Sequence, residues 1–293
     1  MESIKEWIIN ESEVFIDTKD ILGKGQFGIV YKGEWRGLTV AIKRFTHLDE
    51  NKKKLVENEF KAMTKLHHPN IIQLLGIIQK PFSIVMEYLP KGSLSMYLKK
   101  HPWTSWDRKL LFMMDIAKGL AYLHARKPSF IIHRDIKPTN FLVTKDLQIK
   151  IADFGICKIL ETDIIQKSQE NLQYIQDIHA TSNVGTLYYM APELVVKQKI
   201  THYSASVDIY SFGSVMYEIF EGRKIFHFCE NREEFIGILS KHYRPRIEKS
   251  LPFIKKIILD CLSHNPLKRP TALGVLKYFQ YHRKKKWWLK YRF

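Results

Sequence analysis

The stretch H-R-D-I-K-P-T-N at residues 133–140, followed by D-F-G at residues 153–155, decides the interpretation of this chain. It places an acid, a lysine and an asparagine at fixed offsets, with a second acid thirteen residues after Asn140. Magnesium-dependent transfer of phosphate from a nucleotide to a hydroxyl needs such a set: one carboxylate orients the hydroxyl, while the other carboxylate and the amide hold metal ions. The pattern therefore predicts a phosphotransfer site.

Length and composition indicate an ordinary soluble globular protein. The chain has 293 residues, of which 45% are hydrophobic and 26% charged, enough to bury a substantial core. Cys157, Cys229 and Cys261 are widely spaced and form no C-x-x-C pair, which favours a reducing compartment. Residues 1–10 lack the apolar run of a signal peptide, and no stretch approaches the ~20 apolar residues of a membrane helix. We expect a cytoplasmic location, with the nucleus as the alternative.

The net charge of +17 is concentrated at the C-terminal end, where residues 283–293 read R-K-K-K-W-W-L-K-Y-R-F. Basic residues mixed with aromatic ones can sit at an anionic membrane surface or stack on nucleic-acid bases. We expect residues 282–293 to form a basic aromatic tail that contacts such a surface. The alternatives are a frayed helix end whose tryptophans pack on the domain, and a solvated basic surface without a specific partner.

Hydrophobic periodicity divides the chain into two parts. Strand patterns occur within residues 21–45, 71–78 and 82–86, with one helical pattern at residues 52–66. After residue 92 the period becomes helical, apart from two short strands that flank the interval from Asn140 to Asp153. The further helices are expected at residues 205–221, 231–240, 252–263 and 271–283. This predicts an α+β fold with a small, mostly β N-terminal lobe (about 15–88) and a larger, mostly helical C-terminal lobe (about 91–281), preceded by an extension at 1–14. A nucleotide site is expected between the lobes.

A glycine loop with the pattern G-x-G-x-x-G is formed by Gly23, Gly25 and Gly28. Without Cβ atoms, glycines let backbone N–H groups approach phosphate oxygens closely. Dinucleotide-binding folds use the same string, and Asp49 stands near the position of their ribose-binding acid. Those folds continue as a helix, whereas here the strand-like residues 29–31 follow, so we expect a phosphate-covering hairpin.

Together with V-A-I-K at residues 40–43 and A-P-E at residues 191–193, these motifs resemble the protein kinases over roughly residues 15–281. The resemblance implies transfer of the ATP γ-phosphate to protein hydroxyls, with Mg²⁺ as cofactor. It implies the following roles: Lys43 holds the α and β phosphates, Glu59 pairs with Lys43, Asp135 accepts the hydroxyl proton, Lys137 neutralises the γ-phosphate, and Asn140 and Asp153 bind magnesium.

The same resemblance assigns the adenine site and several supports. Met86 would be the gatekeeper, and Glu87 and Leu89 would offer backbone groups to the base. Apolar side chains expected around the nucleotide are Leu22, Val30, Ala41 and Leu142. The supporting residues would be Glu193 pairing with Arg269, Asp208 holding the catalytic-loop backbone, and His133 and Phe154 packing behind the site.

Substrate class is indicated by Lys137, two residues after Asp135, and by G-T-L-Y-Y-M at residues 185–190. Both match serine/threonine kinases, and Thr186 could bond Asp135 and Lys137. Trp7 and the segment M-E-Y-L-P-K-G-S-L at residues 86–94 are more typical of tyrosine kinases. The mixture resembles the tyrosine-kinase-like group of serine/threonine kinases. Dual specificity is one alternative, and a pseudokinase-like scaffold is another, although the catalytic set is complete.

The interval from Asp153 to Glu193 is long for this family, at 41 residues (193 − 153 + 1). Arg134 beside the catalytic aspartate is typical of kinases that are switched by a phosphate in this interval. We hypothesise that Thr181 or Ser182 is the switch. The alternative is a passive loop.

Overall fold

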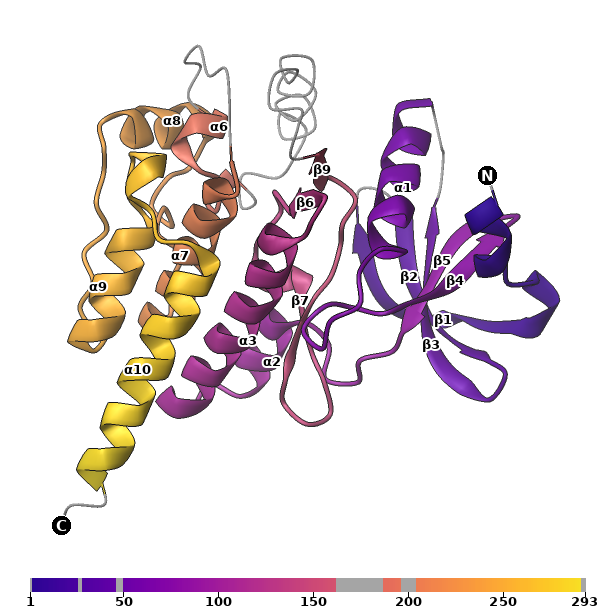
Figure 1. Cartoon of the computed structure of the whole chain (residues 1–293), viewed down its shortest axis with the longest axis horizontal. Coiled ribbons are helices and arrows are strands. Elements are labelled where there is room, and N and C mark those ends of the chain that lie inside the picture. Colours follow the sequence, from indigo (N-terminus) through magenta and orange to yellow (C-terminus); the bar gives the residue numbers. More distant parts are fainter. Residues whose placement is uncertain (1, 26–27, 46–49, 162–186, 196–203, 291–293) are drawn as a thin grey trace.

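The computed structural model describes residues 2–25, 28–45, 50–161, 187–195 and 204–290. Its N-terminal part is a five-stranded antiparallel sheet in the order β1-β2-β3-β5-β4, accompanied by one long helix, α1 (Figure 1). The elements are β1 (Val14–Gly25), β2 (Gly28–Trp35), β3 (Leu38–Phe45), α1 (Glu50–Met63), β4 (Leu74–Gln79) and β5 (Phe82–Glu87), preceded by the short 3-10 helices η1 (Glu2–Trp7) and η2 (Glu11–Glu13).

The C-terminal part is mostly helical and lies at the opposite end of the molecule in Figure 1. Its helices are α2 (Leu94–Lys100), α3 (Trp106–Ala125), α6 (Pro192–Val195), α7 (Ser206–Glu221), α8 (Arg232–Ser240), α9 (Pro252–Cys261) and α10 (Ala272–Lys290), with the 3-10 turns η3 (Pro138–Asn140) and η4 (Pro266–Lys268). Its strands form two antiparallel pairs, β6 (Ser129–Ile132) with β9 (Lys158–Glu161) and β7 (Phe141–Val143) with β8 (Ile149–Ile151).

The predicted two-lobed α+β fold is confirmed, with differences in detail. The seven-residue helix α2 and the four-residue strands β6 and β9 are elements that were not expected from the sequence. The strand expected from residue 71 begins at Leu74, because Ile71 instead bridges to Ile151 of β8. Helix α10 continues beyond the expected residue 283 to Lys290. Within the described ranges, no helix is long and apolar enough to cross a bilayer.

The segment before β1 packs against the sheet edge. Ile8 forms a parallel bridge with Ile77 of the edge strand β4, and the Ile9 N–H donates to the Ile77 carbonyl at 2.8 Å. The Ile9 side chain is buried with Val40 and Val85. Ile9 thus adds to the hydrophobic face of the sheet, whereas Ile8 remains exposed.

The connection from α1 to β4 fastens the two lobes together. The Asn70 side-chain amide donates to the Ile149 carbonyl at 2.9 Å, and the Ile151 N–H donates to the Asn70 carbonyl at 2.9 Å. Gly119 lets helix α3 pack closely against β8, since a Cβ at this position would lie 2.7 Å from the Ile151 side chain. The contacts of Asn70 fix β8, and therefore Asp153 just after it, relative to the N-terminal sheet.

Candidate active site

Three elements bring Lys43, Glu59 and Asp153 into contact between the lobes. Lys43 lies on β3, Glu59 on α1, and Asp153 follows β8. The Lys43 Nζ lies 2.8 and 2.9 Å from the two Glu59 carboxylate oxygens and 2.9 Å from Asp153 Oδ1. The Lys43–Glu59 pair expected from the sequence is therefore present, and the lysine also reaches Asp153.

Electrostatics keep Lys43 and Asp153 charged. Burial disfavours the Lys43 ammonium, but Asp153 and Glu59 outweigh burial and raise the pKa of Lys43. Burial likewise opposes ionisation of Asp153, yet Lys43 lowers the pKa of Asp153 to about 2. The Asp153 side chain is 38% exposed and its backbone has a φ of 67°, a conformation that is uncommon outside glycine and often found at functional sites. An ionised, partly exposed carboxylate is thus available to a cation between the lobes.

The loop before β7 holds a second cluster, made by Asp135, Lys137 and Asn140. The Lys137 Nζ lies 2.8 Å from Asp135 Oδ2, and Asn140 Nδ2 donates to the same oxygen at 2.7 Å and to the Asp135 carbonyl at 2.9 Å. Because Nδ2 of Asn140 is hydrogen-bonded to Asp135, Oδ1 is the side-chain atom of Asn140 that can coordinate a metal. Oxygen atoms from Asn140 and Asp153 suit the hard Mg²⁺ ion, so the residues fit that cofactor.

Asp208 of α7 supports this loop from behind. Its carboxylate accepts hydrogen bonds from the backbone N–H groups of His133 at 2.9 Å and Arg134 at 2.8 Å, and it contacts His124 Nε2 at 2.8 Å. Burial works against the charge of Asp208, but the hydrogen bond with His124 lowers its pKa below the ordinary value. The supporting contact predicted for Asp208 is present, whereas His124 was not anticipated.

His133 and Phe154 are both fully buried, with ring centroids 4.9 Å apart. His133 Nε2 lies 3.1 Å from the Ala152 carbonyl. Both rings pack behind the loop, in the position expected of them.

The apolar residues predicted around the nucleotide belong to one cluster. Ala41 and Met86 are buried and directly paired across β3 and β5. The half-buried side chains that pack against the same cluster are Leu22, Val30, Leu89 and Leu142.

The three loop glycines have different steric surroundings. A Cβ at Gly28 would lie 2.1 Å from the Arg44 carbonyl oxygen, so the fold itself requires glycine there. A Cβ at Gly23 would meet nothing within 4 Å, and one at Gly25 would only touch the Gly28 carbonyl at 3.9 Å. Protein packing leaves open the space over Gly23 and Gly25, which fits a loop whose backbone approaches a phosphate.

Sequence reasoning missed the role of the Glu87 side chain. Its Oε1 accepts from the Gln73 N–H at 2.8 Å and from Lys150 Nζ at 2.6 Å. Lys150 lies on β8, so this ion pair joins the end of β5 to the strand that leads to Asp153. A lysine between Ile149 and Ile151 in a buried strand was the available signal.

The predicted regulatory residues Thr181 and Ser182, and Thr186, lie outside the described residues. Arg134, expected to receive a phosphate, donates from Nε to the Ile156 carbonyl at 2.6 Å and from a terminal nitrogen to the Cys157 carbonyl at 3.2 Å. It is therefore engaged with the first residues after D-F-G.

The predicted support between Glu193 and Arg269 is present and bidentate, with N–O distances of 2.5 and 2.8 Å. Arg269 also donates to the Ser263 carbonyl at 2.7 Å and the Ser206 carbonyl at 3.0 Å. The contact ties α6 to α7 and to the turn before α10.

Comparison with known proteins agrees with this geometry. The profile of the protein kinase domain matches residues 16–279. The chain therefore belongs to the protein kinase family.

Its relatives place it more narrowly. Over 93% of its length the chain is 33% identical to the serine/threonine-protein kinase VIK and 34% identical to the serine/threonine/tyrosine-protein kinase HT1, both of Arabidopsis thaliana. Over 92% of its length it is 35% identical to a protein of Acanthamoeba polyphaga mimivirus named as serine/threonine-protein kinase/receptor R826. The chain spans 61%, 67% and 15% of these three relatives respectively. The predicted membership of the tyrosine-kinase-like group of serine/threonine kinases is confirmed.

Proposed function

We propose that this chain is an active protein kinase that transfers the γ-phosphate of ATP to serine and threonine hydroxyls of protein substrates. The observation that carries the proposal is the position of Lys43, within 2.9 Å of both Glu59 and Asp153. Phosphoryl transfer leaves little covalent work to the protein, so catalysis depends on positioning and on charge. A lysine held at one spot by two carboxylates supplies such positioning.

Each polar residue of the site has a separate task. Asp135 orients the attacking hydroxyl and accepts its proton, and Lys137, 2.8 Å from Asp135, offsets the charge of the γ-phosphate. Asn140 and Asp153 would hold Mg²⁺, which supplies charge neutralisation across the phosphates. Leu22, Val30, Ala41 and Leu142 would enclose the adenine, with Met86 behind it, while backbone groups of Glu87 and Leu89 would bond its edge.

A phosphotransfer assay with labelled ATP tests this proposal. The purified chain should phosphorylate a peptide library in the presence of Mg²⁺, and Asp153→Ala should lower kcat by more than ~10²-fold because a group that stabilises transferring charge is removed. Thermal unfolding of both proteins checks that the variant is folded. A folded wild-type chain that binds ATP without transferring phosphate would instead indicate a scaffold.

Dual specificity is the second candidate, and it is supported by relatives. HT1 is named as a serine/threonine/tyrosine kinase, and shkB of Dictyostelium discoideum, 32% identical, as a dual specificity protein kinase. Peptide libraries centred on serine, threonine and tyrosine would distinguish serine/threonine specificity from dual specificity. Tyrosine phosphorylation within tenfold of the serine rate would favour dual specificity.

Two further roles are proposed, one for Thr181 or Ser182 and one for the C-terminal tail. A phosphate on Thr181 or Ser182 would switch activity, and a T181A/S182A protein that works at the wild-type rate would contradict this. The basic tail from residue 282 would bind an anionic surface, either lipid or nucleic acid; it begins with the exposed residues Arg283, Lys284 and Lys285 on α10. Truncation after Tyr281 should then weaken salt-dependent binding to anionic vesicles or RNA.

A further inference from the structure

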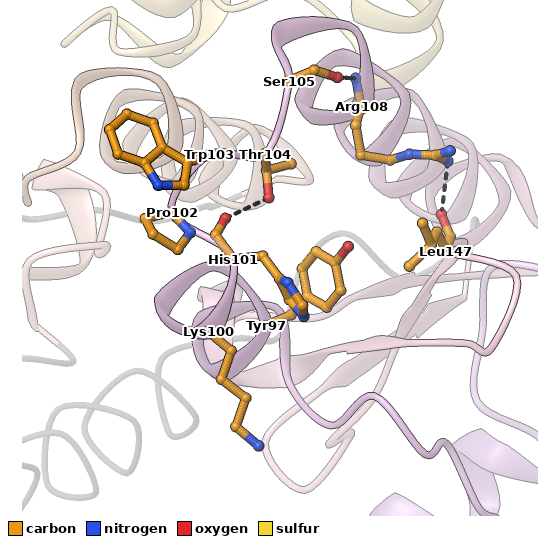
Figure 2. Close-up of a pocket in the computed structure, with 9 residues that line it drawn as sticks. All are labelled: Tyr97, Lys100, His101, Pro102, Trp103, Thr104, Ser105, Arg108 and Leu147. Atoms are coloured by element: carbon orange, nitrogen blue, oxygen red, sulfur yellow. Dashed lines mark hydrogen bonds between the residues drawn. The ribbon is translucent and has the colours of Figure 1, made fainter.

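The C-terminal lobe carries an open hollow of about 370 Å³ away from the nucleotide site. It lies between the end of α2, the segment 101–105 and the start of α3, and is closed on one side by Leu147 in the turn between β7 and β8 (Figure 2). None of its nine lining residues belongs to the set that surrounds Lys43, Asp135 and Asp153. The hollow can therefore be filled while the active site is in use.

Part of the wall of the hollow is held by contacts within the protein. Tyr97 packs edge-on against Phe112 of α3 with ring centroids 5.7 Å apart, and His101 lies 4.5 Å from the Tyr97 ring. The Thr104 hydroxyl donates to the His101 carbonyl at 2.6 Å, and Arg108 donates to the Leu147 carbonyl at 3.5 Å. Because these contacts fix the wall around Tyr97 and His101 in advance, mainly the exposed side chains of Trp103 and Lys100 would have to be ordered on binding.

Trp103 is the unusual feature of this surface. Its side chain is 95% exposed, whereas Trp106, three residues later, stacks on Phe220 at 4.9 Å. Figure 2 shows the Trp103 indole beside Pro102, on the opposite side of the Tyr97 and His101 rings from Arg108. An exposed indole next to a fixed aromatic wall is typical of the side chains that contribute most to protein binding.

The charge of the hollow is one-sided. Lys100 and Arg108 line it, His101 lies between them, and none of the nine lining residues, all in the described part of the chain, is acidic. Asp107 and Asp146 neighbour lining residues in sequence but do not line the hollow. Cations beside an apolar wall complement a ligand that is acidic and also carries a large apolar group.

We propose that this hollow docks an acidic segment of a protein partner, with a large apolar side chain of the segment packed on Trp103 and its carboxylates facing Lys100 and Arg108. The occupant is a peptide because the site alternates an apolar wall with separate cations, which matches side chains spaced along an extended chain. Its volume of about 370 Å³ offers room for a few side chains.

Binding of fluorescein-labelled peptide pools tests the proposal directly. One pool carries central Leu, Phe or Trp flanked by Glu and Asp; a second has lysine flanks, and a third keeps the acidic flanks but has a central Ser. The first pool should bind best. A double variant with Trp103→Ala and Lys100→Glu should bind this pool about tenfold more weakly, or weaker still. Both side chains are exposed, so the variant should remain folded, which its Tm would check.

The matched control is Leu267→Ala with Lys277→Glu, which changes an equally exposed apolar residue and one exposed lysine elsewhere. This control should bind the first pool like the wild type. The proposal is overturned if no acidic pool binds, if both double variants weaken binding equally, or if a single-stranded RNA 12-mer binds at Trp103 and the peptides do not. These readouts use no phosphotransfer, so they stand or fall independently of kinase activity.

Discussion

Two ion pairs of similar geometry lie in different parts of this molecule and have different surroundings. Lys43–Glu59 joins β3 to α1, and Lys43 also reaches Asp153, a carboxylate that remains 38% exposed. Arg269–Glu193 lies in the C-terminal lobe, where the arginine side chain has no exposed surface and three backbone carbonyls also accept from it. The first pair lies between the lobes and keeps a charge available to a ligand, while contacts within the protein satisfy the second. Similar contacts therefore serve catalysis in one region and architecture in the other.

Glu193→Ala would break the architectural pair and should have the largest effect on stability. It leaves the Arg269 guanidinium buried without its carboxylate, which typically costs ~3–5 kcal/mol, or ~10 °C in Tm for a domain of this size. Differential scanning calorimetry measures the shift. Glu248→Ala is the control, since that carboxylate pairs with Arg246 at an exposed position and should cost under ~1 kcal/mol. Equal shifts for the two variants would remove the distinction between the pairs.

Glu59→Gln tests the cleft pair and should affect activity more than stability. The amide cannot hold the Lys43 ammonium as a carboxylate does, so kcat/KM should fall about 10- to 100-fold, or ~1.4–2.7 kcal/mol. Burial raises the pKa of Glu59, with Lys43 opposing, so a neutral side chain is tolerated and Tm should move by less than ~3 °C. Steady-state kinetics and calorimetry give both values.

The control for Glu59→Gln is Glu57→Gln, on the same helix. Glu57 is exposed and lies 3.8 Å from Lys61, so its replacement should leave kinetics and Tm unchanged. A loss of activity from Glu57→Gln as large as that from Glu59→Gln would mean that the helix, rather than the pair, was disturbed.

Lys150→Met would remove the ion pair with Glu87 and should have a smaller effect. Glu87 remains partly open to water, with 26% of its side chain exposed, so the stability cost should stay below ~1 kcal/mol. Because the pair fixes the end of β5 relative to β8, the KM for ATP should rise about threefold while kcat changes little. Lys145→Met, at an exposed lysine in the turn between β7 and β8, should change neither constant.

The reactivity of two buried thiols should show the smallest difference between the two regions. Burial raises the pKa of Cys157, two residues after Gly155, to about 12, and it also raises the pKa of Cys261 near Arg269. Since the thiolate is the reactive form, iodoacetamide should label Cys157 very slowly at pH 8 and faster as the pH rises toward 12. Glu193→Ala should accelerate labelling of Cys261 more than of Cys157, measured by peptide mass mapping. Equal acceleration at both thiols would indicate global rather than local loosening.

The sequence allowed most of the site to be predicted because the site consists of short contiguous motifs. Asp135, Lys137 and Asn140 share one loop, and Glu59 could be predicted because it shares one face of the expected helix with the apolar residues. Contacts between distant, individually unremarkable residues were not predictable: Glu87 and Lys150 are 63 positions apart. Helix α2 is too short for a clear period, and β6 and β9 form strands only because they pair with each other. The exposure of Trp103 depends on how α2 meets α3, which no local pattern encodes.

The bridge between Ile8 and Ile77 has a consequence for the solution behaviour of the protein. Strand β4 ends the sheet, and the bare edge of a flat apolar strand is a template for pairing with another chain. The short N-terminal segment occupies part of that edge and buries Ile9 over it. These few residues thus oppose self-association through the edge of β4. A chain shortened to begin at residue 15 should aggregate more readily, although it keeps all its catalytic residues.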